Sequence, residues 1–263
     1  MPTADSDIFW LGAVTSLLAG LGTSLGALAI FVLRKPSTRT MIGLISGAAG
    51  VMLAASFFSL LGPAFEYANG GGPFRIGAGT VAVVVGVFAG AGVLFMIHRY
   101  APHEHFDRGR EGPERTRFSR LWLFVIAIAL HNFPEGMAVG VGFAGGNIAN
   151  GVALGLGIGL QNIPEGLAVA VSMLAIGYTR RVGFAVSSLT GLVEPIGGAI
   201  GAAAVVLAEP AMPLILGIAA GAMLFIISDE IIPETHRGPD RDLATFALLA
   251  GVVVMMLLSA ALE

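Results

Sequence analysis

Eight long apolar stretches follow one another along this chain of 263 residues. A helix needs about 20 mainly apolar residues to cross a bilayer. Each stretch reaches that length, and charge or turn signals such as Gly70-Gly71-Gly72-Pro73 separate them. The stretches are 8–33, 41–62, 76–98, 121–144, 148–176, 182–208, 211–232 and 243–262. The sequence therefore predicts an all-α, polytopic membrane protein with eight transmembrane helices, folded as one domain over residues 1–263.

The placement of the basic residues predicts an orientation. With eight spans, thirteen of the 14 Lys and Arg residues fall on one side of the membrane, and Arg75 alone falls on the other. Cytoplasmic loops are enriched in Lys and Arg, so both termini are expected outside the cytoplasm, in a cell (plasma or inner) membrane. The net charge of −3 gives no indication of a nucleic-acid partner.

The longest hydrophilic stretch, 99–120, is expected to be a cytoplasmic loop between the third and fourth helices. It contains His103-Glu104-His105. A solvated loop is the favoured interpretation. The alternative is a weak metal-collecting tract at a cytoplasmic exit, since His-rich tracts bind metal ions.

The fourth and fifth predicted helices repeat one motif. Residues 131–136 read HNFPEG and residues 161–166 read QNIPEG. His131 and Glu135 are four residues apart, as are Gln161 and Glu165, so each pair shares one helix face. Each motif begins roughly 15–20 Å into a hydrocarbon core about 30 Å thick. The proline in each motif is expected to free a backbone carbonyl, which is tolerated only beside protein or a water-filled cavity.

Three glutamates are predicted at membrane depth without a fixed positive partner. They are Glu135, Glu165 and Glu194, and no predicted span contains Lys or Arg. A charge at the bilayer centre costs at least about 2.5–3.5 kcal/mol. One such glutamate could be a protonated hydrogen-bonding group, but three together favour a cation bound from solution. Nitrogen and oxygen donors that suit Zn²⁺, Fe²⁺, Mn²⁺ or Cd²⁺ come in addition from His131, Asn132, Gln161 and Asn162.

Two further groups accompany the motif. Met52 lies in the middle of the second span, where the sequence alone favours a packing role over a ligand role. Asp229 and Glu230 end the seventh helix near the predicted cytoplasmic face. They either cap and solvate that helix end or form, with His103 and His105, an exit path for a metal ion.

The doubled motif resembles the signature of the ZIP family of metal transporters, and most of all its GufA-like prokaryotic branch. The resemblance extends to Glu194-Pro195 and to residues 229–236, which read DEIIPETH, so it covers the whole chain. It implies a ZIP-like bundle, uptake of divalent metal toward the cytoplasm, an elevator-like movement of the ligand-bearing helices, and a homodimer.

The resemblance also implies a binuclear metal centre. One site would comprise His131, Glu135, Gln161 and Glu165, with Met52 as a further ligand. A second site would comprise Asn132, Asn162 and Glu194, and would share Glu135 and Glu165. Gln161 stands where many members have His, and Asn162 where some have Asp, and both changes weaken the ligand set.

The predicted function is therefore transport of divalent metal, zinc above all, and not catalysis. Zinc would be the cargo, with no resident cofactor. One alternative is an intramembrane metalloenzyme, although the chain has no His-Glu-x-x-His motif. The other is a proton-coupled carrier of a small organic cation, although the motif faces carry only Phe133 where an aromatic cage would be expected. The donor set leaves open the order of preference among Zn²⁺, Fe²⁺, Mn²⁺ and Cd²⁺.

Overall fold

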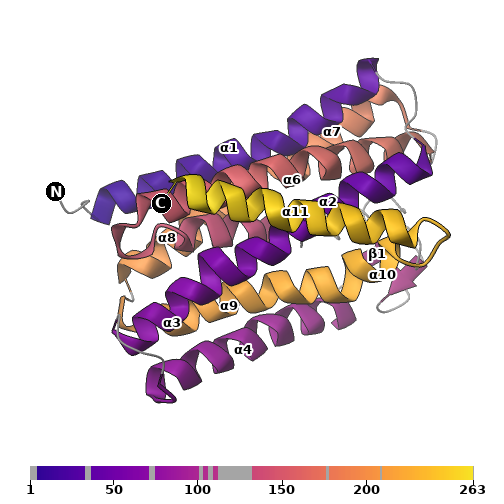
Figure 1. The fold of residues 1–263 in the computed structure, drawn as a ribbon. Helices are drawn as coiled ribbons and strands as arrows, with labels where there is room; N and C mark the ends of the chain where they lie inside the picture. Colours follow the sequence, from indigo (N-terminus) through magenta and orange to yellow (C-terminus); the bar gives the residue numbers. More distant parts are fainter. Residues whose placement is uncertain are drawn as a thin grey trace.

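Long helices lie side by side in a single bundle in the computed structural model of the chain (Figure 1). The structure describes residues 5–32, 37–70, 75–100, 103–105, 109–111, 132–175, 178–207 and 209–262. The predicted all-α class is confirmed, apart from one short hairpin described below. The long helices of the bundle are α1 (Asp5–Val32), α2 (Thr38–Ala55), α4 (Ala78–Tyr100), α6 (Ile148–Ala175), α7 (Arg180–Gly191), α8 (Glu194–Leu207), α9 (Met212–Ile226) and α11 (Arg241–Leu262).

Short elements extend or join these helices. The helix α2 continues through η1 (Ser56–Leu61) and α3 (Gly62–Asn69). In the same way, α9 continues through η4 (Ile227–Ile231) and α10 (Ile232–Thr235). Single turns, η2 (Ala144–Gly146) and η3 (Glu209–Ala211), precede α6 and α9. Residues 132–141 are also helical.

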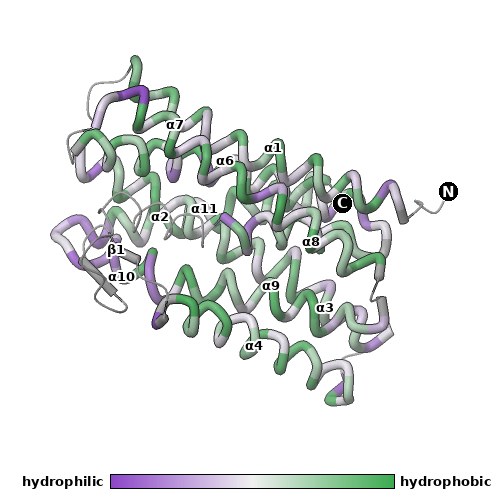
Figure 2. Tube along the Cα trace, turned by 180° about the vertical axis from the view of Figure 1, so that it is seen from behind, coloured by the Kyte–Doolittle hydropathy of each residue, from purple (hydrophilic) through white to green (hydrophobic). Residues whose placement is uncertain are grey.

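Seven helical segments among the described residues are long and apolar enough to cross a membrane. They correspond to seven of the eight predicted spans, so the polytopic membrane assignment is confirmed. The remaining span, predicted at 121–144, lies largely outside the described residues, and only its helical part from residue 132 is seen. Figure 2 shows hydrophobic residues along the length of the helices and hydrophilic residues gathered toward the two ends of the bundle.

The helices form two groups. In the first helix group, α1 packs against α6, α7 and α8, and segment 132–141 packs against α8. In the second helix group, α4 packs against α9, and α2 packs against α11. The two groups meet where α6 contacts α2 and α11.

Within each group, glycine lets helix backbones approach closely. A Cβ added at Gly136 would collide with the carbonyl oxygen of Glu194, and one added at Gly221 would collide with that of Val87. Small residues serve this purpose in membrane proteins, where close backbone packing replaces the hydrophobic effect as a source of helix association. At the boundary between the groups, Gly157 of α6 meets the side chains of Val51 and Met255 and no backbone of the second group among its three nearest atoms.

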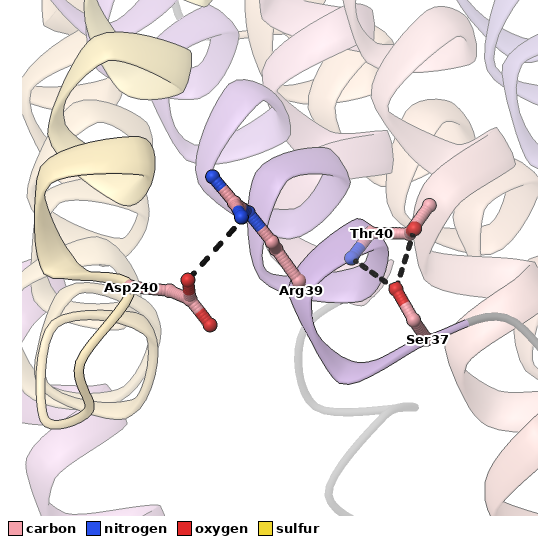
Figure 3. A network of polar contacts seen from close by, with 4 residues as sticks. All are labelled: Ser37, Arg39, Thr40 and Asp240. Carbon is pink, nitrogen blue, oxygen red and sulfur yellow. Dashed lines mark hydrogen bonds and ion pairs between the residues drawn. The ribbon is translucent and has the colours of Figure 1, made fainter.

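Both termini lie at one end of the bundle, and β1 and α10 lie at the other (Figure 1). At this second end, part of the loop predicted at 99–120 forms a hairpin, in which β1 (His103–His105) pairs antiparallel with β2 (Gly109–Glu111). Arg39 Nε lies 3.6 Å from Asp240 Oδ1 and links the start of α2 to the turn before α11 (Figure 3). The Ser37 side chain caps α2 by accepting a hydrogen bond from the Thr40 backbone N–H.

Two helices of the second group contain a π-helical segment just before a proline. The N–H of Gly62 donates to Phe57 and that of Ile232 donates to Ile227, each five residues back. Pro63 and Pro233 follow these residues and cannot donate to Ser59 and Asp229, the carbonyls four residues earlier, because proline has no N–H. By contrast, Pro164 lies inside α6 without breaking it. Such π segments are frequent at functional sites.

Candidate metal-binding site

The predicted site residues of the repeated motif lie in the first helix group. Segment 132–141 carries Asn132 and Glu135, and α6 carries Gln161, Asn162 and Glu165. His131, the first residue of the motif, lies outside the described residues. Four of these side chains are fully buried: those of Asn132, Glu135, Gln161 and Asn162.

Glu135 is paired with the motif of the neighbouring helix. Gln161 Nε2 donates a hydrogen bond of 2.7 Å to Glu135 Oε1. The other oxygen of Glu135 and the amide oxygen of Gln161 are buried without a hydrogen-bond partner among the described residues. An unsatisfied buried oxygen costs about 1–3 kcal/mol. Both oxygen atoms are therefore suited to bind a cation.

Glu194 forms the second pair of the site. The sixth predicted span is interrupted, because α7 ends at Gly191 and α8 begins at Glu194, just before Pro195. The break places the carboxylate at a helix N-terminus, whose partial positive charge stabilises an anion. Asn162 Nδ2 donates to Glu194 Oε1 at 2.7 Å and to the Ala19 carbonyl of α1 at 2.9 Å.

The second pair is also incompletely satisfied. The second oxygen of Glu194, the amide oxygen of Asn162 and both amide atoms of Asn132 are buried without a hydrogen-bond partner in the described part of the chain. Together with the first pair, this leaves a concentration of unused oxygen acceptors in the first helix group. Carboxylate and amide oxygens of this kind bind hard or borderline divalent cations.

The three membrane glutamates are brought into one electrostatic neighbourhood. Glu165, which is partly exposed, acts on both Glu135 and Glu194, and Glu194 acts on Glu135. Each of these interactions is a repulsion when both carboxyl groups are ionised. The described residues of the seven candidate spans that carry Arg do so at the segment ends, as at Arg39, Arg180 and Arg241, so no fixed cation offsets the repulsion at depth.

Met52 lies in α2, in the second helix group, and is fully buried in the main apolar cluster. Its carbonyl accepts a hydrogen bond of 2.9 Å from Ser56 Oγ. α2 is the helix through which the second group contacts α6. Met52 is thus on the opposite side of the group boundary from the motif residues, and its role as a ligand stays a prediction.

The predicted exit residues lie at the end of the bundle remote from the termini. Asp229 and Glu230 belong to η4, where Glu230 is buried and Asp229 is partly exposed. The backbones of His103 and His105 lie in β1, at the same end (Figure 1). Asp229, Glu230 and the backbones of the two histidines therefore lie at the same end of the bundle, and the exit path that they would form stays a prediction.

Among the described residues, no group of three or more His, Asp and Glu side chains is arranged to hold a metal ion. Half of the donors at the motif are amides, and His131 lies outside the described residues. The described residues thus supply the carboxylate and amide part of the predicted ligand set, at one place in the first helix group.

A cavity of about 410 Å³ was not anticipated from the sequence. It lies between α3 and the start of α6, and Glu66, Asn147 and Asn150 are among its lining residues. Asn150 Nδ2 donates to the carbonyl of Gly142 at 2.9 Å and to that of Ser59 at 3.1 Å. One signal in the sequence could have pointed to this region. Pro63 has no N–H, so it cannot donate a hydrogen bond to the carbonyl of Ser59, four residues before it.

Comparisons with known proteins agree with one another. A family model described as ZIP zinc transporter matches residues 98–259. The chain is 44% identical to the zinc transporter ZIPB of Bordetella bronchiseptica over 91% of its own length and 77% of the relative's. It is 41% identical to the zinc transporter GufA of Myxococcus xanthus over 95% and 98% of the two chains. It is 33% identical to human zinc transporter ZIP11, over 91% and 94%.

Proposed function

The chain belongs to the ZIP family of zinc transporters, and from this premise we propose that it carries Zn²⁺ across a membrane through the buried carboxylates of its first helix group. It is a transporter and not an enzyme. The observation that carries the proposal is the grouping of Glu135, Glu165 and Glu194 among helices whose described residues carry Arg only at the ends of the candidate spans.

A mobile cation supplies what this arrangement lacks. Two carboxylates near one another at low dielectric are costly unless they are protonated or bind a cation. A divalent ion neutralises two of them at once, and it can accept the unused oxygens of Glu135, Glu194, Gln161 and Asn162 as ligands. Cd²⁺, Fe²⁺ and Mn²⁺ share the donor preference, so they are expected to compete with Zn²⁺ to differing degrees.

The two hydrogen-bonded pairs support two adjacent metal positions. We place one ion with Glu135, Glu165, Gln161 and His131, and assign Met52 as a further, neutral donor. We place the second with Glu194, Asn162 and Asn132. Glu165, which acts electrostatically on both other glutamates, would bridge the two positions together with Glu135.

Transport toward the cytoplasm is what the resemblance to ZIP transporters implies, and the predicted topology assigns the two ends of the path. The positive-inside pattern puts both termini outside the cytoplasm of a cell membrane, and the end that carries β1 and α10 faces inward. Zinc would therefore enter from the end with the termini. It would leave past Asp229 and Glu230, with His103 and His105 near the exit.

The division into two groups supports movement of the first group as one body. Its ligand-bearing helices are held to α1 and α8 by close backbone contacts, whereas Gly157, which faces the second group, meets the side chains of Val51 and Met255. Such a boundary can slide without separating the ligands of the first group from one another, while Met52, which lies in the second group, would change its position relative to them. The second group, with its exposed apolar faces on α4 and α11, would form the stationary part and the contact surface of a homodimer.

The test is uptake of ⁶⁵Zn²⁺ into proteoliposomes containing the purified full chain. Glu135→Gln and Glu165→Gln keep the shape of the side chain and remove its charge. Each is expected to lower the initial uptake rate at least about tenfold, because a carboxylate ligand contributes charge that an amide does not. Asp242→Asn, at an exposed position on α11, is the matched control and should transport normally. Uptake at the parent rate in either glutamate variant would overturn the site assignment.

A further inference from the structure

We propose that Asn150 is a positioning residue that holds the two helix groups together at the end of the bundle carrying the termini, and that its hydrogen bond to Ser59 breaks when the first group moves. Asn150 is the third residue of α6, in the first group. Ser59 belongs to η1, in the second group. The inference rests on the proposed movement of the first group.

One amide nitrogen spans the boundary. Asn150 Nδ2 donates to the Gly142 carbonyl, within the first group, at 2.9 Å, and to the Ser59 carbonyl, across the boundary, at 3.1 Å. An amide NH₂ has two protons, so both bonds can form at once. The first bond fixes the side chain to its own group, and the second joins that group to its neighbour.

At this position the backbone of the second group offers the Ser59 carbonyl as an acceptor to Asn150. In a regular α-helix the Ser59 carbonyl would accept from residue 63, but Pro63 has no N–H to donate. The helix instead passes through the π-helical segment η1, in which Gly62 donates to Phe57. The Ser59 carbonyl thus lacks its usual donor, and the side chain of another group supplies one.

The surroundings allow this bond to open. Asn150 and Gly142 line the cavity of about 410 Å³, together with Pro63 and Glu66 of the second group. Water in that cavity could satisfy both Asn150 and Ser59 after they separate, which lowers the cost of opening. A fully buried bond between the groups would resist movement more strongly.

The experiment measures opening directly and needs no transport. The chain has no cysteine, so a single reporter can be introduced at Leu154→Cys, one helical turn beyond Asn150 at a fully buried position. Its rate of reaction with a charged maleimide is measured in nanodiscs without zinc. Asn150→Ala in this background should raise the rate about three- to tenfold, the factor expected from loss of one hydrogen bond in a two-state opening.

Matched variants separate this role from general loosening. Asn147→Ala removes an asparagine that lines the same cavity and whose Oδ1 accepts a hydrogen bond from the Asn150 backbone N–H, within the first group. It should leave the labelling rate near the parent value. A reporter at Ser46→Cys, buried in the half of α2 toward the other end, should not become faster in the Asn150→Ala background. Equal acceleration in all of these proteins would overturn the proposal.

A second variant changes the acceptor side of the same hydrogen bond. Pro63→Ala restores an N–H that can bond to the Ser59 carbonyl within its own helix, so it should also raise labelling at Leu154→Cys. Because both changes act on one bond, the double variant should add little to the larger single effect. Full additivity, or no effect of either change, would sink the proposal. Loss of uptake in Glu135→Gln is independent of these rates, so failure of the two ideas can be told apart.

Discussion

The two helix groups use similar residues for different ends. Both bring helix backbones together through glycine, at Gly136 in the first group and Gly221 in the second. The first group then buries carboxylates and amides at membrane depth, whereas the second surrounds its close contacts with apolar side chains such as Leu216, Met223 and Ile226. Under the proposed function, close packing would give the first group its rigidity, and its unsatisfied polar atoms would bind the cargo.

The second group differs also in containing two π-helical segments. Its two π-helical segments lie toward opposite ends of the bundle, one before Pro63 and one before Pro233. The first segment, η1, contacts α6 across the group boundary, whereas η4 contacts α2 and α9 of its own group. Under the proposed function, the first group would carry the donors for the cargo, and the second carries the π-helical segments.

The largest expected effect contrasts a charged donor in the first group with a neutral one in the second. Glu194→Gln should lower zinc uptake at least about tenfold, since it removes a charge, whereas Met52→Leu should raise the half-saturating zinc concentration only a few-fold. The measurement is the dependence of initial ⁶⁵Zn²⁺ uptake on zinc concentration. A larger loss from Met52→Leu than from Glu194→Gln would reverse the division of roles between the groups.

The next effect concerns packing. Gly136→Ala inserts a methyl group against the Glu194 carbonyl and should destabilise the protein by about 1–3 kcal/mol, as overpacking does. Gly92→Ala in α4 meets open space and should change stability by less than about 1 kcal/mol. Thermal unfolding of the two variants in the same detergent compares them. Equal melting temperatures would show that the close contact at Gly136 is not needed for stability.

The smallest effect concerns the ion pair at the end remote from the termini. Arg39 and Asp240 both belong to the second group, and the Arg39 side chain is 72% exposed. Such a pair contributes about 0–1 kcal/mol, so Arg39→Gln should leave the melting temperature almost unchanged. Its zinc uptake should also equal that of the parent protein. A marked loss of uptake would mean that this end of the second group takes part in transport.

The apolar pattern predicted much of the fold. Seven of the eight predicted spans coincide with helices in the structure, because length and hydropathy alone decide which segments can cross a bilayer. The break before Glu194-Pro195 was also signalled, since a proline cannot continue the hydrogen bonding of the preceding turn. The identical signal at Pro164 produced no break, because α6 continues through that position. A proline therefore marks a possible interruption, and packing decides whether it occurs.

The sequence by itself determined the membrane helices, their charged ends and the set of donors that must lie at depth. These depend on local length, hydropathy and spacing within one helix. Tertiary structure alone decided that Glu135 pairs with Gln161 and Glu194 with Asn162, and that Asn150 reaches Ser59 across the group boundary. The reason is that each of these contacts joins different helices. Their relative position depends on which backbones can approach closely, and no periodicity within a single segment records it.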